Sequence, residues 1–295
     1  MERFFSLLLL FVLTKALHAD HNRVLGIAAN GVHYHFAVEE SFLEDVSLKV
    51  QGWHEVDRAT FDNILDQIPS SPLISREGQT ASLIEELSSL GIASSVDSLN
   101  IETACFATPN GQTSFCISNF DEKLALSPIQ EVELVHIDGN VICNGIAVEQ
   151  AMEQALRAKA TISLDLVNLP PIIEKLRERL LGLITAYVNL LFVNKDEACA
   201  LTRLTPKDAA GFLKNFCDIV VVDEGSEGCW IGSKDKLFHC PSTPEEDHFA
   251  VKGSFICGFL YGFLQHRSLN TCAQLGNLAK WQGSRTLSHL DSNAK

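Results

Sequence analysis

The feature that most constrains the fold is an alternation of short apolar runs with segments of helical periodicity. The apolar runs have the length and composition of buried strands, and they occupy residues 22–29, 132–139, 161–167, 189–194 and 217–225. Segments with apolar residues at helical spacing lie between or beside them, at residues 81–91, 147–160 and 170–187. Because neighbouring parallel strands need a crossover that is usually a helix, this order predicts an α/β fold with a mostly parallel central sheet and helices on both faces.

A second kind of pattern predicts smaller elements beside this sheet. Residues 102–118 are typical of two strands around the turn Pro109-Asn110-Gly111, and residues 229–240 are typical of a hairpin. Residues 38–48 and 59–68 have helical spacing, and the chain from Val251 onward is expected to be helical. We find neither an internal repeat nor a linker rich in Pro, Gly or Ser, so residues 20–295 are expected to form one domain.

Residues 1–19 differ in composition from the rest of the chain. Glu2 and Arg3 precede an apolar run from Phe4 to Leu13, and Ala19 ends the segment. This order is close to that of a secretory signal peptide, and the run is shorter than the roughly 20 residues that span a bilayer. Two interpretations stay open: a removable export signal, or an apolar leader that is retained.

The net charge and the cysteine content argue against several kinds of partner and site. The formal net charge of -14 repels phosphate backbones, which argues against DNA or RNA as a partner. The nine cysteines are odd in number and include no C-x-x-C pair, so neither a zinc ribbon nor a disulfide framework is expected. Cys229 and Cys240 flank the predicted hairpin, where they either act as small buried apolar residues or pair if the protein is exported.

From Arg23 onward, the order of segments resembles the ribokinase/PfkB family of carbohydrate kinases, in particular its adenosine-kinase-like branch. The stretches that carry the resemblance are CFATPNGQTSF (105–115), LFVNKDEACALT (191–202), VVVDEGSEGCWI (220–231) and FICGFLYGFLQ (255–265). The resemblance implies a ribokinase-like three-layer α/β/α domain with a small β lid. It also implies ATP and Mg²⁺ as cofactors, and transfer of the γ-phosphoryl group to a hydroxyl of a sugar or nucleoside.

The family's catalytic turn, D-T-x-G-A-G-D, corresponds here to residues 247–253. Asp247 is retained, Ala250 and Lys252 replace the two glycines, and Gly253 stands where the resemblance implies the catalytic Asp. Loss of a general base costs roughly 10²–10⁴ in rate, so the sequence favours a kinase-like protein with impaired transfer. The alternative is an active sugar or nucleoside kinase with a non-standard base, for which Asp247 is the candidate. Lys252 is either a cation beside a bound phosphate or a solvated side chain.

The substrate side also departs from the family pattern. His33 stands at the position of an Asp that holds substrate hydroxyls, and Gly78 and Ser82 stand in the family's second glycine motif, with Ser82 in place of Asn. The resemblance makes these three residues the substrate-binding candidates. After Gly91 the chain passes almost directly to the 102–118 hairpin, which implies a domain shortened near residue 91.

The nucleotide and metal positions are better retained. Asn194 and Glu197 keep the N-x-x-E pattern that implies a Mg²⁺ role, although the same spacing fits a helix capping box. Gly225 and Gly228 keep the nucleotide-side glycines, and Asp223 replaces the Thr before them, where its charge is expected to repel phosphates. The resemblance also implies a homodimer through the lid and a cytoplasmic protein. A functional signal at residues 1–19 would instead place the protein outside the cytoplasm or in the periplasm.

Overall fold

The computed structural model describes residues 23–50, 53–77, 79–111, 113–118, 129, 131–143, 145–166, 170–242, 252–282 and 287, so the predicted leader lies outside the described residues. Within these ranges, an 11-stranded sheet has the order β11-β10-β9-β8-β7-β6-β1-β4-β5-β2, and β3 pairs with β1 beside that path. The strands are β1 (Val24–Ala37), β2 (Trp53–Val56), β3 (Leu73–Glu77), β4 (Ser94–Ala107), β5 (Thr113–Ser118), β6 (Leu134–Asp138), β7 (Thr161–Asp165), β8 (Leu190–Asn194), β9 (Ile219–Asp223), β10 (Cys229–Ser233) and β11 (Lys236–Cys240).

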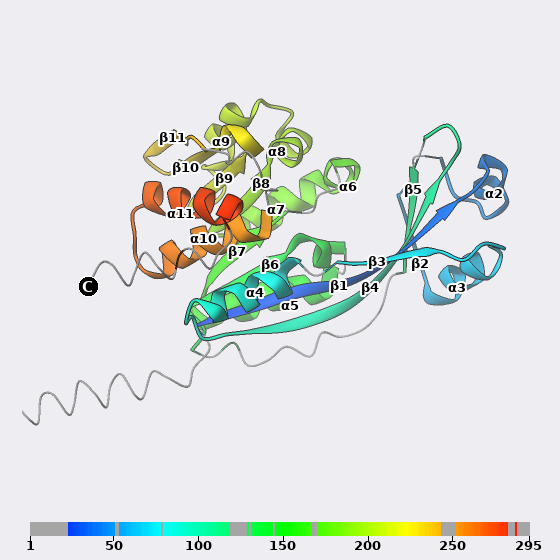
Figure 1. Cartoon of the computed structure of the whole chain (residues 1–295), viewed down its shortest axis with the longest axis horizontal. Helices are drawn as coiled ribbons and strands as arrows, with labels where there is room; N and C mark the ends of the chain where they lie inside the picture. The colour runs from blue at the N-terminus through cyan, green and yellow to red at the C-terminus, as the bar shows by residue number, and fades with distance from the viewer. Residues whose placement is uncertain are drawn as a thin grey trace, which may run out of the picture.

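Helices cover this sheet on both faces (Figure 1). The described α-helices are α2 (Glu40–Asp45), α3 (Arg58–Asp66), α4 (Gln79–Ser89), α5 (Gly145–Ala158), α6 (Pro170–Lys175), α7 (Arg177–Tyr187), α8 (Lys195–Thr202), α9 (Pro206–Leu213), α10 (Lys252–Leu264) and α11 (Leu269–Gln282). Two short 3-10 helices, η1 (Gly139–Cys143) and η2 (Gly225–Glu227), follow β6 and β9. None of the helices in the described ranges is long and apolar enough to span a membrane.

The central strands are predominantly apolar because both of their faces are buried. In β8, Leu191 and Val193 contribute to one core, while Leu190 and Phe192 contribute to the other. The first core lies under α5, α7, α8 and α9, and the second under α4, α10 and α11. Strands β1, β6, β7, β8 and β9 pair in parallel, so the expected three-layer α/β/α fold with a mostly parallel sheet is confirmed.

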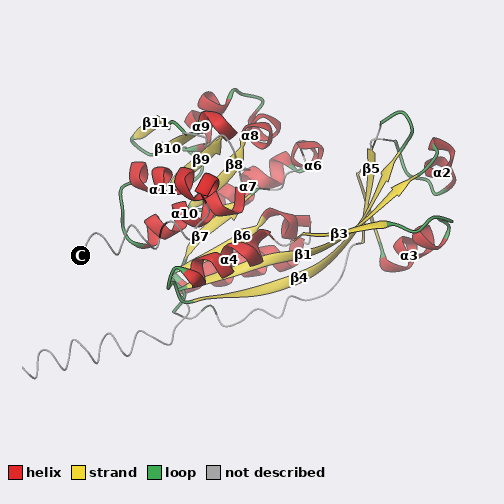
Figure 2. Ribbon diagram, viewed as in Figure 1, coloured by secondary structure: helices red, strands yellow, loops and turns green. Residues whose placement is uncertain are grey.

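The lid grows out of two long strands of this sheet. Strands β1 and β4 are each 14 residues long and stay paired from Val24↔Ser94 to Ala37↔Ala107. Their outer halves carry a separate small core that includes Phe36, Leu43, Phe61 and Phe106, and α2 and α3 pack against it. Figure 2 shows this lid projecting from one end of the layered domain. The lid therefore contains strands and two helices, and these helices overlap residues 38–48 and 59–68, where the sequence predicted helical spacing.

Several boundaries differ from the sequence prediction. The strand expected at residues 22–29 continues to Ala37, because the alternating residues that follow Gly31 extend it into the lid. Strands β2 and β3 were not expected, since their short polar sequences, WHEV and LISRE, carry little apolar signal. The helix expected at residues 170–187 is divided at Leu176 into α6 and α7.

Candidate active site

Four neighbouring parallel strands end in polar residues at the same edge of the sheet. These residues are Asp138 of β6, Asp165 of β7, Asn194 of β8 and Asp223 of β9. The strand register sets Asp138 opposite Asp165 and Asn194 opposite Asp223. The carboxyl ends of parallel strands are where open α/β sheets bind ligands, so this row marks the candidate active site.

Asp138 is the most deeply buried acid of this row, with 7% of its surface exposed. Its Oδ2 accepts a hydrogen bond from Thr80 Oγ1 at 3.2 Å, and its Oδ1 accepts one from the backbone N–H of Asn140 at 2.9 Å. Burial raises the pKa of Asp138 from 3.8 to about 6, and the nearby charge of Asp165 acts in the same direction. Sequence reasoning missed Asp138 and Thr80, although an acid at the end of a buried strand was a usable signal.

The first turns of α4 and α10 meet beside Asp138. A side-chain carbon at Gly253, in the first turn of α10, would lie 3.9 Å from the carbonyl oxygen of Gln79, the first residue of α4. Thr80, which donates to Asp138, is the next residue of α4. Deeper in the same contact, Ser254 Oγ donates to Glu86 Oε1 at 3.1 Å. The amino-terminal ends of two helices thus meet at the edge of the sheet, an arrangement that favours an anion.

The structure describes only some of the residues that the sequence predicted to be catalytic or substrate-binding. Gly253 lies in the α10 turn described above, and Ser82 is an exposed residue of α4. His33 lies in β1, where its backbone is paired with Ser75 and Thr103, but its side chain lies outside the described part of the structure. The same holds for the side chain of Lys252, which begins α10, and for the whole of Gly78 and Asp247.

Asn194 and Glu197 form the capping box at the start of α8. Asn194 Oδ1 accepts the backbone N–H groups of Asp196 and Glu197 at 2.9 and 2.8 Å, and Glu197 Oε2 accepts the Asn194 N–H at 2.8 Å. The Glu197 side chain is fully buried. The capping interpretation is therefore confirmed, whereas the Mg²⁺ role stays a prediction. Among the described residues, no group of three or more His, Cys, Asp or Glu side chains is arranged to hold a metal.

Asp223 is engaged by a buried lysine that sequence reasoning did not connect to it. Lys280 Nζ of α11 lies 2.7 and 2.9 Å from the two carboxylate oxygens of Asp223 and donates to the carbonyl of Gly225 at 3.0 Å. Only 3% of the Lys280 side chain is exposed, and the rings of Phe255 and Trp281 lie 5.7 and 5.8 Å from its Nζ. The repulsion expected from Asp223 is thus opposed by a cation in direct contact.

The two glycines after Asp223 have backbone shapes that explain their presence. Gly225 has φ of 72° and Gly228 has φ of 105°, a region in which residues with a side chain are strained. A side chain at Gly228 would also clash with the carbonyl of Cys240, the last residue of β11. The loop from Asp223 to Gly228 is therefore fixed by its own backbone, by Lys280 and by the end of the hairpin.

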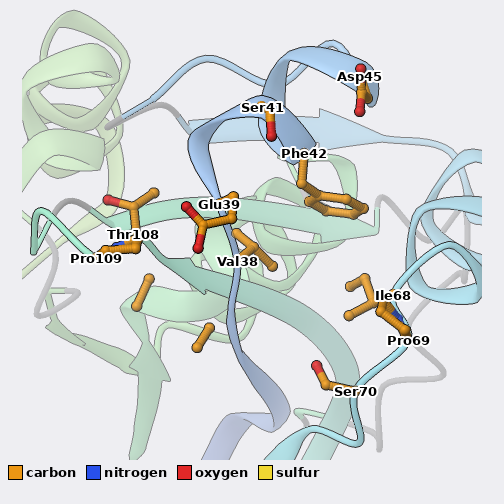
Figure 3. Close-up of a pocket in the computed structure, with 12 residues that line it drawn as sticks. Val38, Glu39, Ser41, Phe42, Asp45, Ile68, Pro69, Ser70, Thr108 and Pro109 are labelled. Atoms are coloured by element: carbon orange, nitrogen blue, oxygen red, sulfur yellow. The ribbon is translucent and has the colours of Figure 1, made fainter.

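A separate cavity lies in the lid. It has a volume of about 590 Å³ and is formed by the outer ends of β1 and β4, by α2 and by the residues that follow α3. Figure 3 shows Val38, Phe42 and Ile68 lining its apolar part, with Glu39 and Asp45 among the polar residues around it. The cavity contains none of the predicted site residues. Its size is typical of a small-molecule pocket.

Comparisons with known proteins agree with this architecture. The sequence pattern of the pfkB family of carbohydrate kinases matches residues 78–282. A protein of Archaeoglobus fulgidus named as an uncharacterised sugar kinase is 26% identical over 162 residues, which are 53% of this chain and 62% of that protein. The chain thus spans less than two thirds of this relative's length.

Solved structures share the fold at low sequence identity. A probable sugar kinase from Rhizobium etli has a TM-score of 0.64 at 17% identity, covering 93% of this chain and 99% of its own. The adenosine kinase of Sinorhizobium meliloti has a TM-score of 0.63 at 18% identity with the same coverage. At these identities the likeness confirms the ribokinase-like fold.

Proposed function

The chain belongs to the pfkB family of carbohydrate kinases, and on that premise we propose that it is an adenosine-kinase-like member with impaired phosphoryl transfer. The observation that carries the proposal is Gly253, which stands at the position of the family's catalytic Asp and has no side chain to accept a proton. Without that base, the rate of transfer to a sugar or nucleoside hydroxyl is expected to fall by roughly 10²–10⁴.

The ligands of the proposed protein come from its family membership. A sugar or nucleoside would be bound by His33, Gly78 and Ser82, as the resemblance implies. ATP would supply the phosphoryl group, next to the loop that contains Asp223, Gly225 and Gly228 and to Lys252 at the start of α10.

Mg²⁺ would neutralise phosphate charge when bound, and it prefers oxygen ligands with retained waters. The family resemblance implies that Asn194 and Glu197 would hold the ion through water molecules, whereas in the structure Glu197 is fully buried and its Oε2 accepts the Asn194 N–H.

A second candidate function is an active kinase with a substitute base, for which Asp247 was the sequence-based candidate. Asp138 is the described residue that favours this alternative. Its pKa of about 6 is close to the value at which a carboxylate accepts protons efficiently near neutral pH, and Thr80 connects it to the turn that faces Gly253.

Nucleotide binding and turnover separate these functions. For impaired transfer, ATP with Mg²⁺ is expected to raise the unfolding temperature of the full chain, while ADP release stays at background across a panel of sugars and nucleosides. Robust ADP release with any acceptor would refute impaired transfer and support the alternative. In that case, Asp138→Asn and Asp247→Asn identify which carboxylate is required.

Restoring the family residue tests how much of the site is lost. In Gly253→Asp, the described residues outside its own helical turn leave room for the new side chain, because the nearest of their atoms lies 3.9 Å from its first carbon. The substrate positions also differ from the family pattern, so we expect this variant to fold and to stay inactive. Recovery of transfer by the single change would show that only the base is missing.

The compartment depends on residues 1–19. Family membership favours a cytoplasmic protein, while a functional signal would export the mature chain from about residue 20. The intact mass of the protein from its own cells decides between them: removal of residues 1–19 supports export, and a retained leader on a cytoplasmic protein refutes it.

A further inference from the structure

The β10–β11 hairpin sets two cysteines directly opposite each other. Cys229 pairs with Cys240 in the antiparallel register, and both residues are buried, with 0% and 3% of their surface exposed. Directly opposed residues share one face of a sheet, and their Cα atoms lie about 4.5–5.5 Å apart. That separation falls inside the range of about 4.4–6.8 Å that a disulfide requires. The two residues are free thiols in this structure.

The two thiols differ in proton affinity. A hydrogen bond from the Cys229 thiol lowers the pKa of Cys240 to about 7, although burial opposes this shift. The same bond, together with burial, raises the pKa of Cys229. Cys229 is therefore the cysteine that keeps its proton, and Cys240 is the one that more readily forms the thiolate, which is the reactive form of cysteine.

A buried amide supports the thiolate at Cys240. Asn277 of α11 donates from its Nδ2 to Cys240 Sγ at 3.6 Å and to the carbonyl of Pro241 at 3.2 Å. A cysteine that only filled apolar space would not need a polar donor aimed at its sulfur. Because β11 is the terminal strand of the sheet order, opening of this edge gives a small oxidant a route to Cys240.

We propose that Cys229 and Cys240 are a redox-active dithiol that closes to an intramolecular disulfide on reaction with a peroxide. The Cys240 thiolate attacks one oxygen of hydrogen peroxide, the O–O bond breaks, and Cys240 becomes a sulfenic acid. The hydroxide that leaves takes a proton from the solvent and becomes water. Cys229 sulfur then attacks Cys240 sulfur, the S–S bond forms as the S–O bond breaks, and the departing hydroxide takes the Cys229 proton and leaves as a second water. The two thiols lose two electrons, and the peroxide gains them.

The disulfide would form directly beside the loop that follows β9. Gly228 directly precedes Cys229 and packs against the backbone of Cys240, Pro241 and Ser242. Closing the disulfide covalently joins the two ends of the hairpin, and it restricts the unfolded chain. Oxidised protein is therefore expected to unfold at a higher temperature than reduced protein.

Hydrogen peroxide and peptide mapping test the proposal on the full chain. Lys234 and Lys236 lie between the two cysteines, so trypsin separates Cys229 from Cys240 unless a disulfide holds the peptides together. After peroxide treatment and alkylation under denaturing conditions, we expect these peptides to stay joined, with a mass lower by two hydrogen atoms. Recovery of both residues as alkylated thiols, while exposed Cys199 is oxidised, would overturn the proposal.

Single variants test the order of the two steps. Cys229→Ser should accumulate a sulfenic acid at Cys240 that dimedone traps, whereas Cys240→Ser should give no trapped sulfenic acid at Cys229. The matched control Cys199→Ser should form the disulfide as the parent protein does. Trapping at Cys229 instead of Cys240, or over-oxidation of Cys240 without a joined peptide in the parent protein, contradicts the mechanism.

Discussion

Lys280 is a buried cation that donates three hydrogen bonds to the last residue of β9 and to the loop after it. Its partners are both oxygens of Asp223 and the carbonyl of Gly225, and the Asp223 side chain is itself only 13% exposed. In Lys280→Met, the Asp223 carboxylate stays buried without its cation. We expect a loss of about 3–5 kcal/mol in the free energy of unfolding, measured by urea denaturation.

Two further variants test this assignment. Lys280→Met combined with Asp223→Asn should recover part of the loss, since the uncompensated charge is removed. Arg157→Met is the matched surface control. It breaks the exposed Arg157–Glu153 pair, with side-chain exposures of 77% and 48%, and should cost less than about 1 kcal/mol. Equal losses in the buried and the exposed variant would contradict a special role for Lys280.

Because of Asp138, the free energy of unfolding falls as pH rises, which is the opposite of the usual effect of an acid. Its folded pKa is about 6 against 3.8, so the folded state binds this proton more tightly than the unfolded state. The stabilisation is complete below pH 3.8 and is lost as pH rises through about 6. The shift corresponds to a loss of about 3 kcal/mol over this window.

Asp138→Asn isolates this contribution. The amide can replace the hydrogen bonds to Thr80 and to the Asn140 N–H but does not titrate. In urea denaturation from about pH 4 to 7, we therefore expect the variant to gain stability relative to the parent protein as pH rises. A constant difference between the two proteins across this range would show that Asp138 does not titrate there.

Single residues were the least predictable level of this molecule. Gly225 and Gly228 were recognisable from their spacing, but the partner of Asp223 was not, since Lys280 lies 57 residues away in a helix of unremarkable pattern. Asp138 and Thr80 are 58 residues apart and meet only because β6 and α4 are adjacent in the fold. Such contacts depend on packing between elements, which local spacing does not encode.

At the scale of elements, the start of α8 has both a structural and a chemical interpretation. Glu197→Gln keeps an oxygen that can accept the Asn194 N–H, so the capping box and the stability should be largely retained. The variant lacks the carboxylate charge. If Glu197 helps to hold Mg²⁺, adding Mg²⁺ with ATP should raise the unfolding temperature of the parent protein but not of Glu197→Gln.

The next helix supplies the control for this prediction. Thr205 caps α9 by accepting the Asp208 N–H, so Thr205→Ala removes a cap remote from the proposed metal position. It should cost about 1 kcal/mol and keep the Mg²⁺ response. An unchanged response in Glu197→Gln would leave this residue with the capping role alone.

Elements buried on both faces were predicted well because their apolar runs are continuous. Strands β6 to β9 and the β10–β11 hairpin appeared where expected, and so did α4 and α5. The lid was harder to predict. Strand β3 has Leu73 and Ile74 exposed by 75% and 54%, and its pairing with β1 is set by the path of β1 beyond the core. A strand defined by its neighbour carries little signal of its own.

At the scale of the whole molecule, the exposed lid strand is the candidate contact between two copies of the chain. Among the described strands, β3 pairs only with β1, so its other edge is open, and its exposed Leu73 and Ile74 are unusual on a free edge. If the lid forms the predicted homodimer, Leu73→Asp should shift the protein toward monomer in sedimentation equilibrium. Leu156→Asp, at an exposed position of α5 outside the lid, is the control.

The net charge of the molecule makes a separate prediction about nucleotide binding. A formal charge of -14 repels ATP with its bound Mg²⁺ at long range, and the Debye length falls from about 30 Å at 0.01 M salt to about 10 Å at 0.1 M. Lys280 is already engaged by Asp223 and Gly225, so it does not supply a free cation at the loop. We therefore expect the affinity for ATP with Mg²⁺, measured by calorimetry, to increase several-fold over this salt range.

Weaker binding at higher salt would instead show that attraction to a local cation outweighs repulsion by the net charge. Lys252 at the start of α10 is the candidate for this cation. Lys252→Met would then remove that salt dependence, whereas Lys207→Met on the exposed surface of α9 would leave it unchanged.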